Sequence, residues 1–217
     1  MTRGLLLDLD GTLADTLPML RRVYMRFLSD LGRQGDDAGF EEINGPPLHQ
    51  VVAILKERHG IETAVEQLVP HYLDLVRASY LDALPSAGAN ELLSAATQSG
   101  WSCAVVTSNS EPLTRQWLAR YDLACFIVDV IGKESVRVGK PHPEPYLLAL
   151  ARLQCKSEDA IAVEDSAAGV SAATAALIPT FAYVPNAAPL SPLSAGVRVV
   201  SSLFDIIPLL NEVRNNA

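Results

Sequence analysis

The stretch LLLDLDGTLADT, residues 5–16, decides the fold of this chain. It opens with a short apolar run, which is typical of a strand buried on both faces of a parallel sheet. The run meets two carboxylates one residue apart, Asp8 and Asp10, and then Gly11 and Thr12. In an open parallel sheet the ligand crevice lies beyond the carboxyl ends of the strands. These four polar or turn-forming residues are therefore candidates for a functional site.

The two carboxylates indicate a cation. Side by side at the end of a buried strand, they repel each other and lose hydration, which costs free energy unless a proton or a cation lies between them. Mg²⁺ would be satisfied by Asp8, the backbone carbonyl of Asp10 and a third acid from another strand, together with waters and a substrate phosphate. Gly11 lets the chain turn sharply, and Thr12 can offer its hydroxyl and amide to phosphate oxygens. The alternative is that the acids only cap a turn or a helix.

Similar apolar runs recur along the chain, and helix-length segments separate most of them. Strands that alternate with helices at this spacing predict an α/β fold with a doubly wound parallel sheet and helices on both faces. The predicted strands span 4–9, 102–107, 126–131, 160–163, 179–184 and 197–200, and the predicted helices span 87–99, 111–120, 143–153 and 166–176.

One part of the chain breaks this alternation. Three helix-length segments, 17–31, 47–59 and 62–84, follow one another without a strand between them. We therefore predict an inserted α-helical cap domain over residues 15–85, and an α/β core domain made of residues 1–14 and 86–217. A chain of 217 residues is long enough for both.

Composition limits the partners. The chain has 17 Lys and Arg residues against 25 Asp and Glu residues, a formal charge of -8, which argues against nucleic acid and against anionic membranes as partners. Cys103, Cys125 and Cys155 are widely spaced and form no CxxC pair, which indicates neither a disulfide framework nor a thiolate metal site. The first apolar run is too short for a secretion signal. A cytoplasmic location is expected, and the oligomeric state, monomer or homodimer, stays open.

Polar residues also follow other predicted strands. Glu164 and Asp165 come directly after the strand 160–163, where they could supply the remaining corner of a metal site. An acidic helix start is the alternative interpretation.

The expected phosphate ligands come from two further segments. Thr107 and Ser108 end the strand 102–107 with hydroxyls, and Asn109 is a supporting residue next to the free amides of the following helix. Lys140 stands between a glycine and a proline, as a fixed cation at a phosphate site would. Ordinary turn chemistry and a solvated lysine are the alternatives.

These clusters, in this order, resemble the haloacid dehalogenase (HAD) superfamily. The resemblance is to its phosphatase-type hydrolases with a helical cap inserted after the first strand, the subfamily of phosphoglycolate phosphatase and β-phosphoglucomutase. It covers essentially the whole chain outside the cap and rests on the motifs DLDGTLADT, VVTSNS, GKPHPEPYLLA and VEDSAAGVSAA.

The resemblance implies a Mg²⁺-dependent phosphatase acting on small phosphorylated metabolites. Asp8 would attack phosphorus and form an aspartyl-phosphate, while Asp10 would protonate the leaving oxygen and then activate water. The implied ligands of the phosphoryl group are Thr107, Ser108 and Lys140, and the implied ligands of Mg²⁺ are Asp8, the Asp10 carbonyl and Asp165, with Glu164 in support through water.

Two other functions stay open. A sugar phosphomutase shares all four motifs, although the histidine that such mutases usually carry early in the cap is missing from residues 17–20, LPML. A catalytically idle binding protein of the same fold is the other alternative, disfavoured because no motif residue is missing. Asp10 argues against a dehalogenase, which has no alkoxide to protonate.

The cap should determine which substrate is bound, with Asn44 and His49 as candidate contacts.

Overall fold

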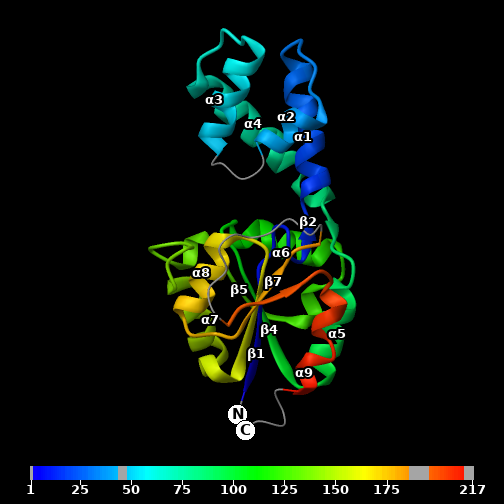
Figure 1. Cartoon of the computed structure of the whole chain (residues 1–217), viewed down its shortest axis with the longest axis vertical. Helices are drawn as coiled ribbons and strands as arrows, with labels where there is room; N and C mark the ends of the chain where they lie inside the picture. Colours follow the sequence, from blue (N-terminus) through cyan, green and yellow to red (C-terminus); the bar gives the residue numbers. More distant parts are fainter. Residues whose placement is uncertain (1, 44–47, 186–195, 213–217) are drawn as a thin grey trace. The chain divides into compact units, whose positions relative to one another are not determined.

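The computed structural model describes residues 2–43, 48–185 and 196–212 (Figure 1). The chain divides into two compact units, which we call the core unit, residues 1–15 and 84–217, and the helical unit, residues 16–83. Among the described residues, none of the helices combines the length and apolar character needed to cross a membrane.

A parallel sheet of six strands forms the centre of the core unit, in the order β5-β4-β1-β6-β7-β8 (Figure 1). The doubly wound α/β sheet predicted from the sequence is confirmed, and each observed strand begins and ends within two residues of its predicted bounds. The strands are β1 (Arg3–Leu7), β4 (Trp101–Val106), β5 (Ile127–Ile131), β6 (Ala160–Glu164), β7 (Thr180–Tyr183) and β8 (Arg198–Val200).

Strand β1 occupies the position where the strand order reverses. It pairs with β4 on one side and with β6 on the other, because the chain first builds β4 and β5 and then crosses back over β1 to form β6. Its residues Leu5, Leu6 and Leu7 are fully buried, as expected for a strand covered on both faces. Ligands of open α/β sheets bind at such a switch point.

Helices cover both faces of this sheet. Helices α7 (Glu144–Leu153) and α8 (Ala167–Ala175) pack on one face, and α5 (Ala89–Gln98) packs on the opposite face (Figure 1). Helix α6 (Glu111–Arg120) has its predicted bounds. Shorter elements that were not predicted are η2 (Ala124–Phe126), η3 (Lys133–Ser135), η4 (Ser157–Asp159), η5 (Leu203–Ile206) and α9 (Leu209–Glu212).

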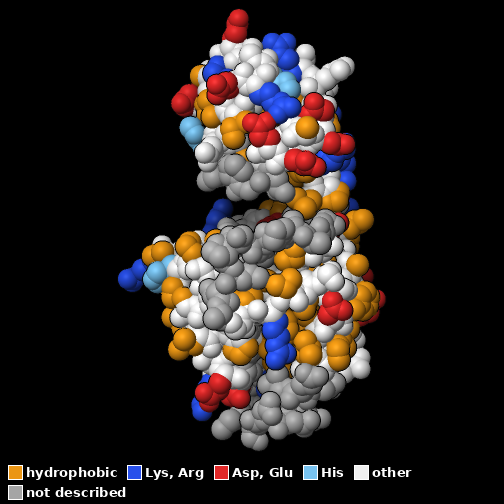
Figure 2. Space-filling model, in the orientation of Figure 1, with side chains coloured by type: hydrophobic (Ala, Val, Ile, Leu, Met, Phe, Trp, Pro, Cys, Tyr) orange, Lys and Arg blue, Asp and Glu red, His pale blue; other side chains and the backbone are white. Residues whose placement is uncertain are grey.

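The helical unit has its own small core. Its elements are α1 (Leu17–Asp30), α2 (Asp37–Glu42), α3 (Leu48–His59), α4 (Val65–Ser79) and η1 (Tyr80–Asp82). The buried residues of α1 recur at helical spacing and form one apolar stripe: Met19, Val23, Tyr24, Phe27 and Leu28. The Phe27 ring meets the Tyr72 ring of α4 edge to face, with 5.0 Å between centroids. Charged side chains lie over the visible outer face of this unit (Figure 2).

The predictions were wrong at two places in and beside this unit. The predicted helix 62–84 begins only at Val65 and ends at Ser79; after η1 the chain forms β3 (Leu84–Pro85), which pairs antiparallel with β2 (Ala14–Asp15). Helix α2 was not predicted, because six residues are too few to show a helical period. The β2–β3 pair holds together the two points where the chain passes between units.

Candidate active site

The sheet brings three strand ends to one edge. In the register of the sheet Leu7 faces Val105 and Val163, so Asp8 lies one residue further on, level with Val106 and Glu164. The backbone N–H of Asp8 donates to the Val163 carbonyl at 3.0 Å, which continues the β1–β6 ladder to this residue. Asp8 is therefore fixed at the switch point by the backbone itself.

Lys140 lies beside Asp8 and is almost fully enclosed, with 6% of its side chain exposed. Its Nζ donates to Asp8 Oδ1 at 2.5 Å, to Glu164 Oε1 at 2.5 Å and to the Val106 carbonyl at 2.7 Å. An ammonium has three hydrogens, so each has an acceptor. Burial lowers the pKa of Lys140, but the Asp8 and Glu164 carboxylates outweigh this effect and hold its pKa above the ordinary value. The ammonium therefore stays charged.

Three acids form a cluster around this cation. Asp8, Glu164 and Asp165 each offer a carboxylate oxygen, and these oxygens lie within 4.8 Å of one another. Burial is the main cause that raises the pKa of Asp8 well above its usual range, with neighbouring acids adding to it against Lys140. Burial and then Glu164 raise the pKa of Asp165 to about 7. One lysine does not neutralise three acids, and an all-oxygen donor set at this spacing fits a hard divalent cation.

Glu164 differs from the other two acids because protein groups already hold both of its oxygens. Its Oε1 accepts from Lys140 and from the Tyr146 hydroxyl at 2.7 Å, and its Oε2 accepts from the Ser166 hydroxyl at 3.2 Å. A methyl group on Gly169 would overlap the Glu164 carboxylate, so glycine is needed there. Asp8 and Asp165 are thus better placed to bind a cation directly, with Glu164 behind them.

The turn after β1 is shaped around Asp165. Gly11 has φ +84°, a conformation that disfavours side chains, and a methyl group on it would overlap the Asp165 carboxylate. The Thr12 hydroxyl is fully buried and donates to Asp165 Oδ1 at 3.4 Å. Asp10 forms a bridge with Ala14 that closes the turn.

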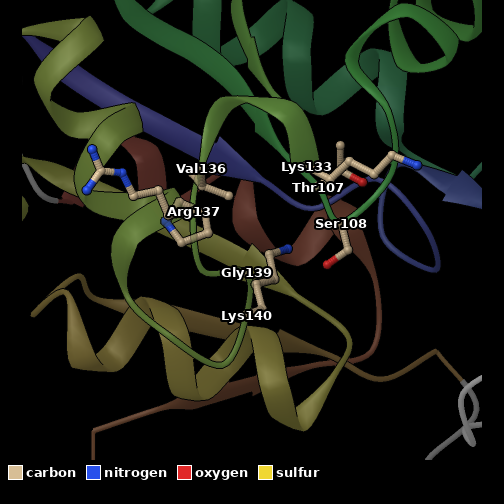
Figure 3. Close-up of a pocket in the computed structure, with 8 residues that line it drawn as sticks. Thr107, Ser108, Lys133, Val136, Arg137, Gly139 and Lys140 are labelled. Carbon is tan, nitrogen blue, oxygen red and sulfur yellow. The ribbon is translucent and has the colours of Figure 1, made fainter.

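A cavity of about 180 Å³ adjoins Lys140. Thr107, Ser108 and Lys140 come together at its edge, whereas the side chains of Lys133 and Arg137 extend away from each other (Figure 3). Val136, Gly139 and Pro145 complete its lining. The hydroxyls and the ammonium that were predicted to bind phosphate therefore share one cavity.

The loop behind this cavity is fixed by Asn109. Its side-chain Oδ1 accepts from the Ser110 N–H at 2.8 Å, and its carbonyl accepts from the Lys133 N–H at 2.9 Å. The Asn109 N–H in turn donates to the Thr107 Oγ1 at 3.0 Å. Asn109 thus shapes the loop and joins the loops that follow β4 and β5.

Two residues that contact Glu164 were not predicted from the sequence, and one predicted residue, His49, lies in the helical unit. Tyr146 and Gly169 contact Glu164, and no spacing in the sequence points from either residue to that acid. His49 is exposed on α3 in the helical unit. Asn44 lies outside the described residues.

The raised pKa of Asp165 predicts a pH-dependent stability. A carboxyl whose pKa rises from 3.8 to about 7 on folding binds its proton more tightly in the folded state. Its contribution is therefore full below the lower value and is lost as the pH rises through the higher one. Urea unfolding in EDTA should show a free energy of unfolding that falls between about pH 4 and pH 7, and falls less in Asp165→Asn. Equal slopes in the two proteins would contradict this account.

Known proteins resemble this chain along most of its length. The family model described as haloacid dehalogenase-like hydrolase matches residues 5–183. A plasmid-encoded phosphoglycolate phosphatase of Cupriavidus necator is 31% identical over 218 residues, 95% of this chain and 92% of that protein. Hexitol phosphatase A of Escherichia coli is 32% identical over 183 residues, 80% of this chain and 79% of that protein.

A solved structure of a Thermotoga maritima protein, assigned as a β-phosphoglucomutase, has the same fold. Its TM-score is 0.86 at 27% identity, over 98% of this chain and 100% of that one. The family match spans β1 to β7 and includes all four clusters of site residues. The chain therefore belongs to the haloacid dehalogenase-like hydrolase family.

Proposed function

We propose that this protein is a Mg²⁺-dependent phosphatase of small phosphorylated metabolites that acts through an aspartyl-phosphate on Asp8. The observation that carries the proposal is the position of the Lys140 ammonium, 2.5 Å from the Asp8 carboxylate and at the edge of the cavity that Thr107 and Ser108 line. A nucleophile, a fixed cation and hydroxyl donors are the parts that phosphoryl transfer needs. The relatives named as phosphatases support the same conclusion.

In the first step an Asp8 oxygen attacks phosphorus in line with the ester oxygen, and the bond from phosphorus to that oxygen breaks as the aspartyl-phosphate forms. Asp10 gives its proton to the leaving oxygen. In the second step Asp10, now a carboxylate, takes a proton from water, and the water oxygen displaces Asp8 from phosphorus. Lys140, Thr107 and Ser108 bind the phosphoryl oxygens throughout.

Asp8, Asp165 and the Asp10 carbonyl would hold Mg²⁺, and Glu164 would support the ion through water. This assignment rests on the two acids whose oxygens are near each other and are less committed to protein donors than those of Glu164. When bound, the ion supplies positive charge against the clustered carboxylates and the phosphoryl group.

The helical unit is proposed to act as a cap that opens for exchange and closes to exclude water, with domain limits near residues 15 and 85. His49 and Asn44 are proposed as its substrate contacts. A cytoplasmic location is proposed as well, because Cys103, Cys125 and Cys155 are free thiols.

A sugar phosphomutase is the second candidate, since the Thermotoga maritima structure assigned to that activity overlays nearly all of this chain. The products separate the two functions. A phosphatase releases one inorganic phosphate for each ester consumed, whereas a mutase returns an isomer and little free phosphate. A suitable panel of substrates contains hexose phosphates, a hexitol phosphate and phosphoglycolate. Phosphate release and ³¹P NMR would identify the products of each reaction.

The primary test is hydrolysis of p-nitrophenyl phosphate. With Mg²⁺ present the protein should release nitrophenol, and removal of the ion with EDTA should lower the rate by at least about 100-fold. Addition of excess Mg²⁺ should restore the rate, which excludes damage to the protein by the chelator. Turnover at an unchanged rate in EDTA would refute the metal-dependent mechanism.

A further inference from the structure

Tyr146 lies in helix α7 with its side chain fully buried, yet its hydroxyl is directed at the site. The hydroxyl donates to Glu164 Oε1 at 2.7 Å, and Lys140 donates to the same oxygen at 2.5 Å. Tyr146 also belongs to a cluster of buried apolar residues that includes Ala149, Leu150 and Ala172. A phenylalanine would fill such a place without a polar atom to satisfy. The hydroxyl therefore calls for an explanation beyond packing.

Tyr146 contacts both members of the buried ion pair. The centre of its ring lies 5.5 Å from the Lys140 ammonium, within the range of a cation–π contact, while its hydroxyl holds the Glu164 carboxylate. The first turns of α7 follow the Lys140 loop directly, with Tyr146 six residues after Lys140. The Tyr146 side chain thus holds the Lys140 ammonium and the Glu164 carboxylate in position relative to each other and to the sheet.

The hydroxyl also alters how strongly Glu164 attracts the ammonium. Glu164 Oε2 accepts a hydrogen bond from Ser166, whereas Oε1 accepts one from Tyr146 and one from Lys140. Without the tyrosine donor, the charge on Oε1 would be met by Lys140 alone. Buried, poorly compensated carboxylates attract a neighbouring cation strongly. The ammonium would then be drawn toward Glu164 and away from Asp8.

We propose that Tyr146 is a positioning residue, which by donating to Glu164 keeps the Lys140 ammonium beside Asp8, where its positive charge acts on a phosphoryl group bound there. This inference rests on the proposed phosphatase function. Through Tyr146, helix α7 takes part in the reaction. The charged and metal-ligating residues of the four sequence motifs do not indicate this role.

A double-mutant cycle tests it with Tyr146→Phe, Glu164→Gln and the double variant. Tyr146→Phe should lower kcat for p-nitrophenyl phosphate by about 10- to 100-fold while KM changes by less than about threefold, because a small displacement of the ammonium weakens transition-state stabilisation. It should also weaken binding of orthovanadate, measured by calorimetry, by about tenfold. The double variant should match Glu164→Gln alone, since Tyr146 acts through that acid.

Tyr72→Phe is the matched control, because it removes the hydroxyl of a buried tyrosine in the helical unit and should leave kcat and vanadate binding unchanged. A wild-type kcat in Tyr146→Phe, or losses that multiply in the double variant, would overturn the proposal. Urea unfolding of all four proteins shows whether the variants are folded. If the wild type does not hydrolyse phosphate esters, the proposed function fails, and vanadate binding across the cycle still decides the role of Tyr146.

Discussion

Asp8→Asn should abolish phosphatase activity, with kcat for p-nitrophenyl phosphate lowered by at least about 1,000-fold and the fold unchanged. An amide has nearly the shape of the carboxylate but is not a nucleophile toward phosphorus. The fold should persist because burial already raises the pKa of Asp8, so a neutral side chain costs little there. Lys140 keeps two acceptors, Glu164 and the Val106 carbonyl. Initial rates with saturating Mg²⁺ and urea unfolding measure the two effects.

Asp74→Asn is the matched control for this loss. Asp74 has 73% of its side chain exposed and pairs with Arg77 on the surface of α4, so its neutralisation should leave kcat unchanged. Acid quench of the wild type during turnover should trap phosphate on the protein in a form that hydroxylamine releases, and Asp8→Asn should trap none. Covalent phosphate in Asp8→Asn, or activity near the wild-type level, would move the nucleophile to another residue.

The fold could be predicted because parallel strands covered on both faces are apolar throughout. Strand β6 is buried along its entire length, and such runs stand out in sequence without any period. The pattern fails where structure is set by contacts distant in the chain. Strands β2 and β3 are two residues each and exist only through their pairing, and the helical period past Ser79 does not show that the chain turns into η1.

The charged part of the site followed from the same logic, since the carboxyl ends of neighbouring parallel strands meet at one edge. That rule brings Asp8 and Glu164 level with each other. It does not give the direction in which a helix presents its residues, so it could not reveal that Tyr146 of α7 meets Glu164 of β6. It is also blind to backbone groups such as the Val106 carbonyl, whose role is independent of residue identity.

Lys140→Met should cause the largest loss of stability among the substitutions considered. The methionine fills a similar volume but leaves Asp8 and Glu164 without the ammonium that they share at 2.5 Å each. Breaking a buried ion pair by removing one partner costs about 3–5 kcal/mol. That loss is expected at about pH 8 in EDTA, by urea unfolding. In Mg²⁺, kcat should fall by about 100-fold or more, because a charge-stabilising donor is missing from the transition state.

Lys156→Met separates the effect of the site from that of losing any lysine. The Lys156 side chain is 63% exposed and pairs with Glu158 at 3.3 Å, so its loss should change stability by less than about 1 kcal/mol.

Mg²⁺ should restore part of the stability of Lys140→Met, since the ion would supply positive charge to the same carboxylates. A lower pH should do so as well, since the pKa of Asp8 is already raised in the folded protein. Wild-type stability of Lys140→Met in EDTA at about pH 8 would contradict this account, because Asp8 and Glu164 would then not depend on the ammonium.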